Sequence, residues 1–264
     1  KTPAFQGTTG NDHVLHEVWD ITTKKTIDTI TKAMAPLDVF IADGHHRYNT
    51  ALNYQEWVKG QKKKQPGADW CMFVLVALQD PGMIVQPTHR VLGGMQGFNL
   101  KKLMDVSAGK MKIKRFMDGF DLEALEAALP NAGPHAMGLY LPQNTDAPLW
   151  LLTTEGDDPL ASTHGDKSEA WRKLDVAILQ ELFVERICQP TFCPNGGEVT
   201  WKFPHTLDQV RAVTEDPAYQ LGVLVQPTPL ESVVRVSQAG ELMPQKSTLF
   251  YPKLATGLVI NPLS

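Results

Sequence analysis

Short apolar runs alternate with segments of helical periodicity along the chain, and turn residues separate them at most junctions. Strands are predicted at residues 14–21 and 219–225, and the clearest helix is predicted at residues 174–187. The 20 glycines and 19 prolines keep the elements short, which excludes a coiled coil or a collagen-like rod. The alternation therefore predicts an α/β fold of the mixed α+β kind.

A chain of 264 residues is long enough for one large domain or two compact ones. The turn-rich sequence Pro-Asn-Ala-Gly-Pro at residues 130–134 interrupts the pattern, which then restarts with paired strands. We therefore expect a boundary near residue 132, between a lobe of residues 1–132 and a second α/β lobe of residues 133–264.

Composition and charge exclude several classes of protein. The formal net charge of -4 argues against a general nucleic-acid binder. The longest apolar run, residues 71–78, is shorter than the roughly 18 residues that cross a bilayer, so no membrane-spanning protein is expected. Three cysteines are too few for a disulfide framework, and they indicate a reducing, cytoplasmic setting. A homo-oligomer is compatible with this composition.

The pattern around residue 43 predicts a buried strand at residues 37–42, a tight turn at Asp43 and Gly44, and a helix at residues 46–58. Two more strands are predicted at residues 70–79 and 84–92, joined by an Asp-Pro-Gly turn. The turn at Asp43 therefore leads from a strand into the N-terminus of a helix.

The sequence Asp43-Gly44-His45-His46-Arg47 combines an acid, two imidazoles and a guanidinium around a glycine at this junction. A helix N-terminus offers free backbone N–H groups and partial positive charge, and Gly44 lets an anion approach the backbone closely. Arg47 can bind phosphate oxygens with two parallel hydrogen bonds. The segment therefore predicts a phosphate-binding turn formed by Gly44, His46 and Arg47.

Asp43, His45 and His46 are the candidate catalytic residues of this turn. Asp43 could orient a histidine, bind a Mg²⁺ ion carried by the phosphates, or cap the helix. One histidine could equally be a packed, hydrogen-bonded residue of the core. A metal held by the histidines would need ligands from elsewhere, such as His89 or His16, because adjacent side chains diverge.

Two further segments have the composition of ligand-binding loops. Pro87-Thr88-His89-Arg90 lies late in a predicted strand, where His89 and Arg90 point to opposite faces, so at most one of them can share a pocket with Arg47. An edge-strand polar pair would look the same.

Near the C-terminus, hydroxyl and lysine side chains occupy a segment punctuated by prolines, which suits an anion-binding loop and equally an ordinary surface turn. Its candidate ligands are Lys246, Ser247 and Thr248, followed by Tyr251-Pro252-Lys253.

The standard nucleotide, hydrolase and zinc-protease signatures are absent from the sequence. There is no Gly-x-Gly-x-x-Gly after a strand, no Gly-x-x-x-x-Gly-Lys-Ser/Thr, no Gly-x-Ser-x-Gly and no His-Glu-x-x-His. Cys188 and Cys193 could form half of a structural metal site, but a second pair is missing.

Three motifs resemble a bacterial and archaeal family known as domain-of-unknown-function family number 1015. They are Ile41-Ala-Asp-Gly-His-His-Arg-Tyr48, Pro87-Thr-His-Arg-Val91, and a C-terminal block from Met243 to Lys253 that continues over residues 256–260. Members of that family are usually longer at the N-terminus, and this chain begins at Lys1 without a methionine. The resemblance implies that the chain is the C-terminal two-thirds of a full protein.

The Asp-Gly-His-His-Arg turn also resembles, more distantly, the nucleotide-phosphate motif of the ParB/sulfiredoxin superfamily. Sulfiredoxins have Gly-Cys-His-Arg there, ParB proteins an Arg-rich box, and free-serine kinases a version with Asp-Gly-His-His-Arg. His45 stands where sulfiredoxins have their catalytic cysteine, which argues against sulfinic acid reduction, whereas His46 and Arg47 match the phosphate-binding positions. No helix-turn-helix is evident for a ParB function. The resemblance implies a ParB/sulfiredoxin-like core.

The leading hypothesis is a protein that binds ATP or ADP with Mg²⁺ at residues 43–47 and transfers a phosphoryl group to a small hydroxylated metabolite. Its rival is a non-catalytic module that senses a nucleotide or metabolite. Glu17 is one acidic candidate for a base, but no base is identified. His89 and Arg90 are further candidate nucleotide ligands, and we expect Lys246, Ser247 or Thr248 to lie within about 15 Å of Arg47.

Overall fold

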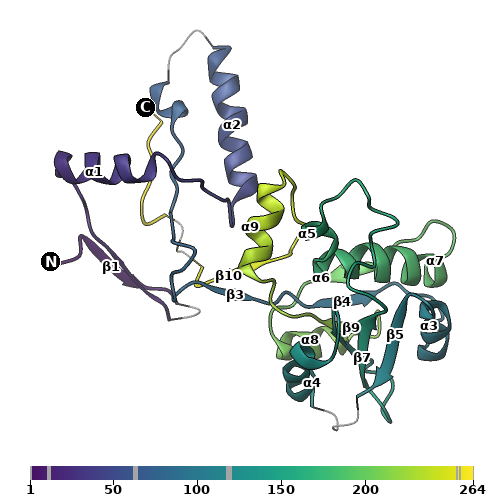
Figure 1. The fold of residues 1–264 in the computed structure, drawn as a ribbon. Helices are drawn as coiled ribbons and strands as arrows, with labels where there is room; N and C mark the ends of the chain where they lie inside the picture. The colour runs from purple at the N-terminus through teal and green to yellow at the C-terminus, as the bar shows by residue number, and fades with distance from the viewer. Residues whose placement is uncertain are drawn as a thin grey trace. The chain divides into compact units, whose positions relative to one another are not determined.

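The computed structural model describes residues 2–10, 13–61, 65–116, 121–253, 255 and 257–263. Helices and strands alternate along the chain, which confirms the predicted mixed α/β fold class (Figure 1). The chain divides into unit 1, residues 1–84 and 250–264, and unit 2, residues 85–249. Residue 132 lies inside unit 2. None of the helices in the described ranges combines the length and apolarity that crossing a bilayer requires.

Unit 2 is built on a six-stranded sheet of order β5-β7-β6-β9-β4-β8, in which the strand pairs are antiparallel. The strands are β4 (Arg90–Gly93), β5 (Met111–Arg115), β6 (Met137–Tyr140), β7 (Leu149–Thr154), β8 (Thr200–Lys202) and β9 (Tyr219–Leu224). Their alternation sends side chains to both faces of the sheet: Val91 joins one apolar cluster and Leu92 the other. Both faces of the sheet are therefore buried.

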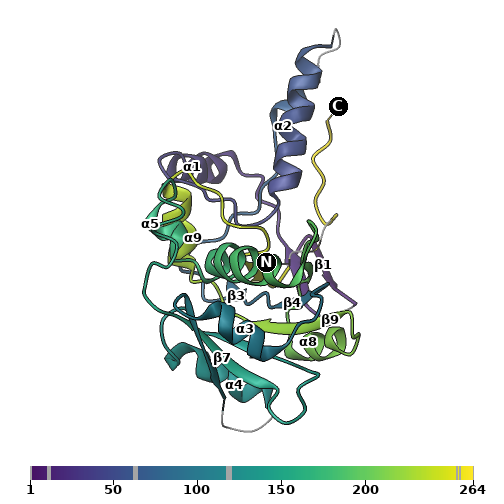
Figure 2. The same cartoon turned by 90° about the vertical axis from the view of Figure 1, so that its right-hand side faces the viewer.

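Helices cover the two faces of this sheet (Figures 1 and 2). On one face, α4 (Leu122–Ala128) and α8 (Leu207–Thr214) pack through leucine and valine side chains. The helices of unit 2 outside that pair are α3 (Leu100–Ser107), α5 (Glu169–Arg172), α6 (Asp175–Ala177), η3 (Ile178–Cys188), α7 (Gln189–Phe192) and α9 (Leu230–Gln238), with a short 3₁₀ helix η2 (Leu129–Asn131). Thr206 caps α8 by accepting a hydrogen bond from the Gln209 N–H at 3.2 Å, as its N-cap position predicts.

The helix predicted at residues 174–187 is present but is mostly a π-helix. Residues 178–188 adopt this wider form, between short α-helical ends at α6 and α7. At its end, the Gln189 backbone N–H donates to the Val184 carbonyl, five residues earlier. That spacing matches the i to i+5 repeat of a π-helix. The predicted helix is therefore present, and residues 178–188 of it have the wider π winding.

A partly buried histidine, His135, connects the turn before β6 to α6. His135 Nδ1 lies 2.7 Å from Asp175 Oδ1, and Nε2 lies 3.0 Å from the Asp157 carbonyl oxygen. Both partners only accept hydrogen bonds, so both ring nitrogens must carry protons. Burial lowers the pKa of His135, but the hydrogen bonds to Asp175 and Asp157 outweigh it, and the pKa lies above its usual 6.5.

We therefore expect the free energy of unfolding to contain a component from His135 that depends on pH. A raised folded-state pKa stabilises the protein fully below the unfolded value of 6.5, and this stabilisation is lost as the pH rises through the raised pKa. Urea unfolding of wild type and His135→Gln across this range measures the component as a difference between the two. If the free energy of unfolding of the two proteins depends on pH in the same way, the imidazole of His135 is not charged as proposed. His45→Gln, at an exposed position, is the control and should keep the pH dependence of the wild type.

The described part of unit 1 contains two α-helices, a short 3₁₀ helix and a small hairpin. Its elements are β1 (Phe5–Thr8), β2 (Leu15–Val18), α1 (Lys24–Met34), α2 (His45–Lys59) and a 3₁₀ helix η1 (Pro66–Asp69). β1 and β2 pair antiparallel from Phe5 opposite Val18 to Thr8 opposite Leu15. The chain passes between the units at β3 (Ile84–Gln86) and β10 (Leu249–Tyr251), which form a two-stranded sheet.

Three strand predictions in this region need correction. Residues 37–42 and 70–79 have no regular secondary structure, and Leu37 is 57% exposed where a buried strand was expected. A strand requires hydrogen-bonding neighbours, and no described residue pairs in a sheet with either run. The strand predicted at 84–92 is split into β3 and β4 after Pro87, which has no N–H for a ladder.

Candidate functional site

The turn at residues 43–47 lies in unit 1 at the start of α2. Gly44 precedes the helix with φ +91° and ψ 21°, in the left-handed region that a glycine adopts without strain. The Gly44 carbonyl accepts the first helical hydrogen bond, from the Tyr48 N–H at 2.9 Å. The N–H groups of residues 45–47 precede that bond, so the helix itself offers them no acceptor.

Arg47 folds back over this glycine. A Cβ atom added at Gly44 would lie 3.0 Å from Arg47 Nη2 and 3.3 Å from Arg47 Nε. The guanidinium therefore lies against the turn, on the same side as the position that a side chain of residue 44 would fill. Glycine is required here both for its backbone conformation and for this close approach.

Asp43 joins the turn to the C-terminal segment of unit 1. Its Oδ1 accepts the Gly44 N–H at 2.8 Å, and its Oδ2 accepts a hydrogen bond from Lys253 Nζ at 2.8 Å. The Lys253 ammonium, through its hydrogen bond and its charge, lowers the pKa of Asp43 below its usual 3.8. Lys253 lies in the C-terminal segment that the sequence analysis named as a candidate anion-binding loop. The hydrogen bond between Lys253 and Asp43 was not predicted.

The histidines of the turn and Arg47 are exposed. Among the residues that the structure describes, none of His45, His46 and Arg47 forms an ion pair. Lys253 and Arg47 thus place two cations against the single Asp43 carboxylate. The turn has a net positive charge next to free helical N–H groups, which is the environment that an oxyanion prefers.

We expect Lys253→Met to raise the pKa of Asp43 toward 3.8, because the variant loses the hydrogen bond and the charge that lower it. An NMR titration of the side-chain carboxyl carbons measures this directly. Lys59→Met is the matched control, since the Lys59 ammonium pairs with Glu56 at the other end of α2. An unchanged Asp43 titration in Lys253→Met would contradict the contact.

The side chains of His89, just before β4, and Arg90, its first residue, point to opposite faces of the sheet, as expected for adjacent residues of an extended chain. His89 is 1% exposed, and its Nδ1 accepts the Val225 N–H at 3.3 Å. The other ring nitrogen, Nε2, lies 3.3 Å from Glu126 Oε1. His89 and Glu126 line a groove of about 350 Å³ at the N-terminus of α8, together with His205.

Arg90 connects the middle motif to the C-terminal motif within unit 2. Its Nη1 donates to the Thr88 carbonyl, and its Nη2 donates to the Lys246 carbonyl at 3.0 Å. Thr228 donates a second hydrogen bond, to the Ser247 carbonyl at 2.9 Å. Lys246 itself is exposed and has a positive φ of 59°. Two segments that the sequence singled out are thus brought together in unit 2.

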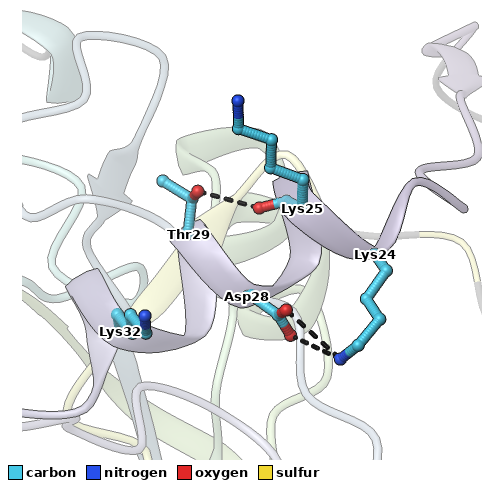
Figure 3. A pocket seen from close by; sticks show the side chains of 5 residues that line it. All are labelled: Lys24, Lys25, Asp28, Thr29 and Lys32. Carbon is cyan, nitrogen blue, oxygen red and sulfur yellow. Dashed lines mark hydrogen bonds and ion pairs between the residues drawn. The ribbon is translucent and has the colours of Figure 1, made fainter.

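A second depression, of about 510 Å³, lies on the exposed side of α1 (Figure 3). It is lined by Lys24, Lys25, Asp28, Thr29 and Lys32. Lys24 pairs with Asp28 at 3.2 Å, one turn along the helix. These side chains belong to a single solvated helix face, and we assign no site to them. Within the described ranges, no three His, Cys, Asp or Glu side chains form a group that could hold a metal ion.

Comparisons with known proteins identify one matching family model, described as "Protein of unknown function (DUF1015)", which covers residues 1–177. No curated protein matches the chain. Among solved structures, a conserved hypothetical protein from Pyrococcus furiosus is 15% identical, with a TM-score of 0.40 over 88% of this chain and 84% of that one. A structure titled "Free serine kinase in complex with AMP" is 14% identical, with a TM-score of 0.40 over 87% of this chain and 81% of that one.

Proposed function

The chain belongs to the DUF1015 family, and we propose that it binds a nucleotide by its phosphates at residues 43–47 and transfers a phosphoryl group to a small hydroxylated metabolite. The observation that supports this most is the turn at Gly44. Gly44 has a left-handed backbone at the N-terminus of α2. The Arg47 guanidinium lies against Gly44, and the Lys253 ammonium binds Asp43 next to it, so cations and N–H donors lie close together at an exposed turn. Phosphate groups are the ligands that such a turn suits best.

Each group of the turn has a distinct task in this proposal. The Arg47 guanidinium binds two phosphate oxygens, and the backbone N–H groups of His45 and His46 face the same anion. The His46 ring, which is exposed, adds a hydrogen bond or a positive charge. These groups act by position and charge, which is most of what phosphoryl transfer requires of a protein.

Asp43 is the residue that would hold a magnesium ion. One carboxylate together with phosphate oxygens and water is a common magnesium environment, so the donor set fits. The ion would supply charge neutralisation for the phosphates. The Asp43 carboxylate also accepts hydrogen bonds from Lys253 Nζ and the Gly44 N–H, which fix the conformation of the turn.

In the proposed transfer, the acceptor hydroxyl oxygen forms a bond to the terminal phosphorus while the bond from that phosphorus to the bridging oxygen breaks. The hydroxyl proton leaves to a base or to solvent, and the shortened nucleotide is released. Coupled assays of ATP and ADP consumption with a panel of small alcohols, sugars and hydroxy amino acids test this directly. Acceptor-dependent consumption supports the transferase, and nucleotide binding without turnover would replace it with a sensing module.

A further inference from the structure

Arg90 is buried in unit 2 without an acidic partner. It is 3% exposed, and among the described residues it forms no ion pair with a carboxylate. Its guanidinium donates to the Thr88 and Lys246 carbonyls and lies 5.4 Å from the centroid of the Phe203 ring. Arginine is rarely buried to this degree unless a counter-charge is present.

The partners of Arg90 leave part of its donor capacity unused. A guanidinium has five N–H groups, and two of them are engaged by carbonyl oxygens, which carry no net charge. Burial alone lowers the pKa of Arg90 to about 10, and no acidic neighbour offsets that effect. The cation therefore bears a desolvation cost that its neutral partners compensate only in part.

Thr88 supplies a second observation at the same place. Its side chain is 2% exposed, and Thr88 Oγ1 has no hydrogen-bond partner among the described residues. Buried hydroxyl groups are nearly always hydrogen-bonded in native proteins, so an orphaned one requires an explanation. A hydroxyl donor and a guanidinium two residues apart both lack an anionic acceptor.

We propose that Arg90 and Thr88 form a phosphate-binding site in unit 2 that is distinct from the nucleotide turn at residues 43–47. An oxyanion of phosphate size accepts two hydrogen bonds from the guanidinium and a third from the Thr88 hydroxyl. It also supplies the missing negative charge. The residues of this site belong to unit 2, whereas the turn at residues 43–47 belongs to unit 1. Its test uses inorganic phosphate and does not require the proposed nucleotide function.

The surroundings of Arg90 explain how an anion reaches it. Phe203 is 37% exposed, so the ring that covers the guanidinium reaches the surface. The segment that supplies the Lys246 carbonyl is exposed at Lys246, and its ammonium adds positive charge near the surface. The hydrogen bond to the Lys246 carbonyl is the one that an incoming phosphate oxygen replaces.

Thr88→Val and Thr88→Ser form a matched pair that tests the site. Valine has the shape of threonine but no hydroxyl, and removing an unsatisfied hydroxyl leaves the unliganded protein at least as stable. We therefore expect Thr88→Val to weaken inorganic phosphate binding at least fivefold, whereas Thr88→Ser retains it. Binding is measured from backbone amide shifts of residues 88–90 during a phosphate titration at constant ionic strength, with chloride as the compensating ion.

Arg47→Ala separates this site from the nucleotide turn. Phosphate-dependent shifts at residues 88–90 should persist in that variant, even though its affinity for nucleotide is lowered. The proposal is overturned if the wild type shows no saturable shift at residues 88–90, or if Thr88→Val binds phosphate as tightly as the wild type. Loss of the shifts in Arg47→Ala would likewise overturn a separate site.

Discussion

Replacing Arg47 with alanine is expected to lower the affinity for ATP and ADP by about tenfold to a hundredfold and to leave the fold intact. Hydrogen bonds to a charged group contribute about 1.5–3 kcal/mol each, and the exposed guanidinium contributes little packing. Isothermal titration calorimetry of wild type and variant measures the loss. Thermal unfolding of the two proteins shows whether the fold is retained.

Two further variants of the same helix make the Arg47 result specific. Arg47→Lys keeps the positive charge but cannot form the two parallel hydrogen bonds, so its affinity should fall between those of wild type and Arg47→Ala. Lys59→Ala removes a cation from the C-terminal end of α2 and should bind as the wild type does. If wild type and Arg47→Ala bind nucleotide with equal affinity, Arg47 does not bind the phosphates.

Gly44→Val is expected to abolish nucleotide binding at any accessible concentration. The new Cβ would lie 3.0 Å from Arg47 Nη2, so the guanidinium must shift by a few tenths of an ångström, and the branched side chain of valine adds further bulk beside it. A left-handed backbone at a β-branched residue also costs about 1–2 kcal/mol, which shifts the turn away from its present conformation. Calorimetry measures the binding, and circular dichroism confirms that α2 remains.

Gly60→Val is the matched control for this substitution. Gly60 caps the other end of the same helix with an ordinary φ of -78°, and the nearest atom to an added Cβ is the Trp57 carbonyl oxygen at 3.4 Å. Its affinity for nucleotide should equal that of the wild type. If Gly44→Val merely loses stability and still binds, the glycine is structural and the phosphate-binding role is wrong.

Unit 2 was largely predictable from the sequence because its elements have strong local signals. Asn99 caps α3 by accepting the Lys102 N–H, and Thr206 caps α8, so both helices begin where their cap residues indicate. β6 and β7 each coincide with a short apolar run that has turn residues on both sides. These signals lie within a few residues of the elements that they define.

The strands predicted in unit 1 depended on contacts that no local pattern encodes. An apolar run such as residues 70–79 becomes a strand only when a neighbouring strand pairs with it, and the described residues provide none. The same limit applies to the site. The turn, Gly44 and α2 follow from five adjacent residues, whereas the Asp43–Lys253 contact joins residues 210 positions apart.

The backbone amides of residues 44–47 provide the most direct test of the proposed nucleotide site. A titration of the protein with ADP, followed by ¹H–¹⁵N NMR, should shift the amide signals of Gly44, His45, His46 and Arg47 in a saturable manner. Adenosine, which lacks the phosphates, should leave these four signals in place. Saturable ADP binding that shifts other amides but not these four, or equal shifts with adenosine, would contradict phosphate binding at this turn.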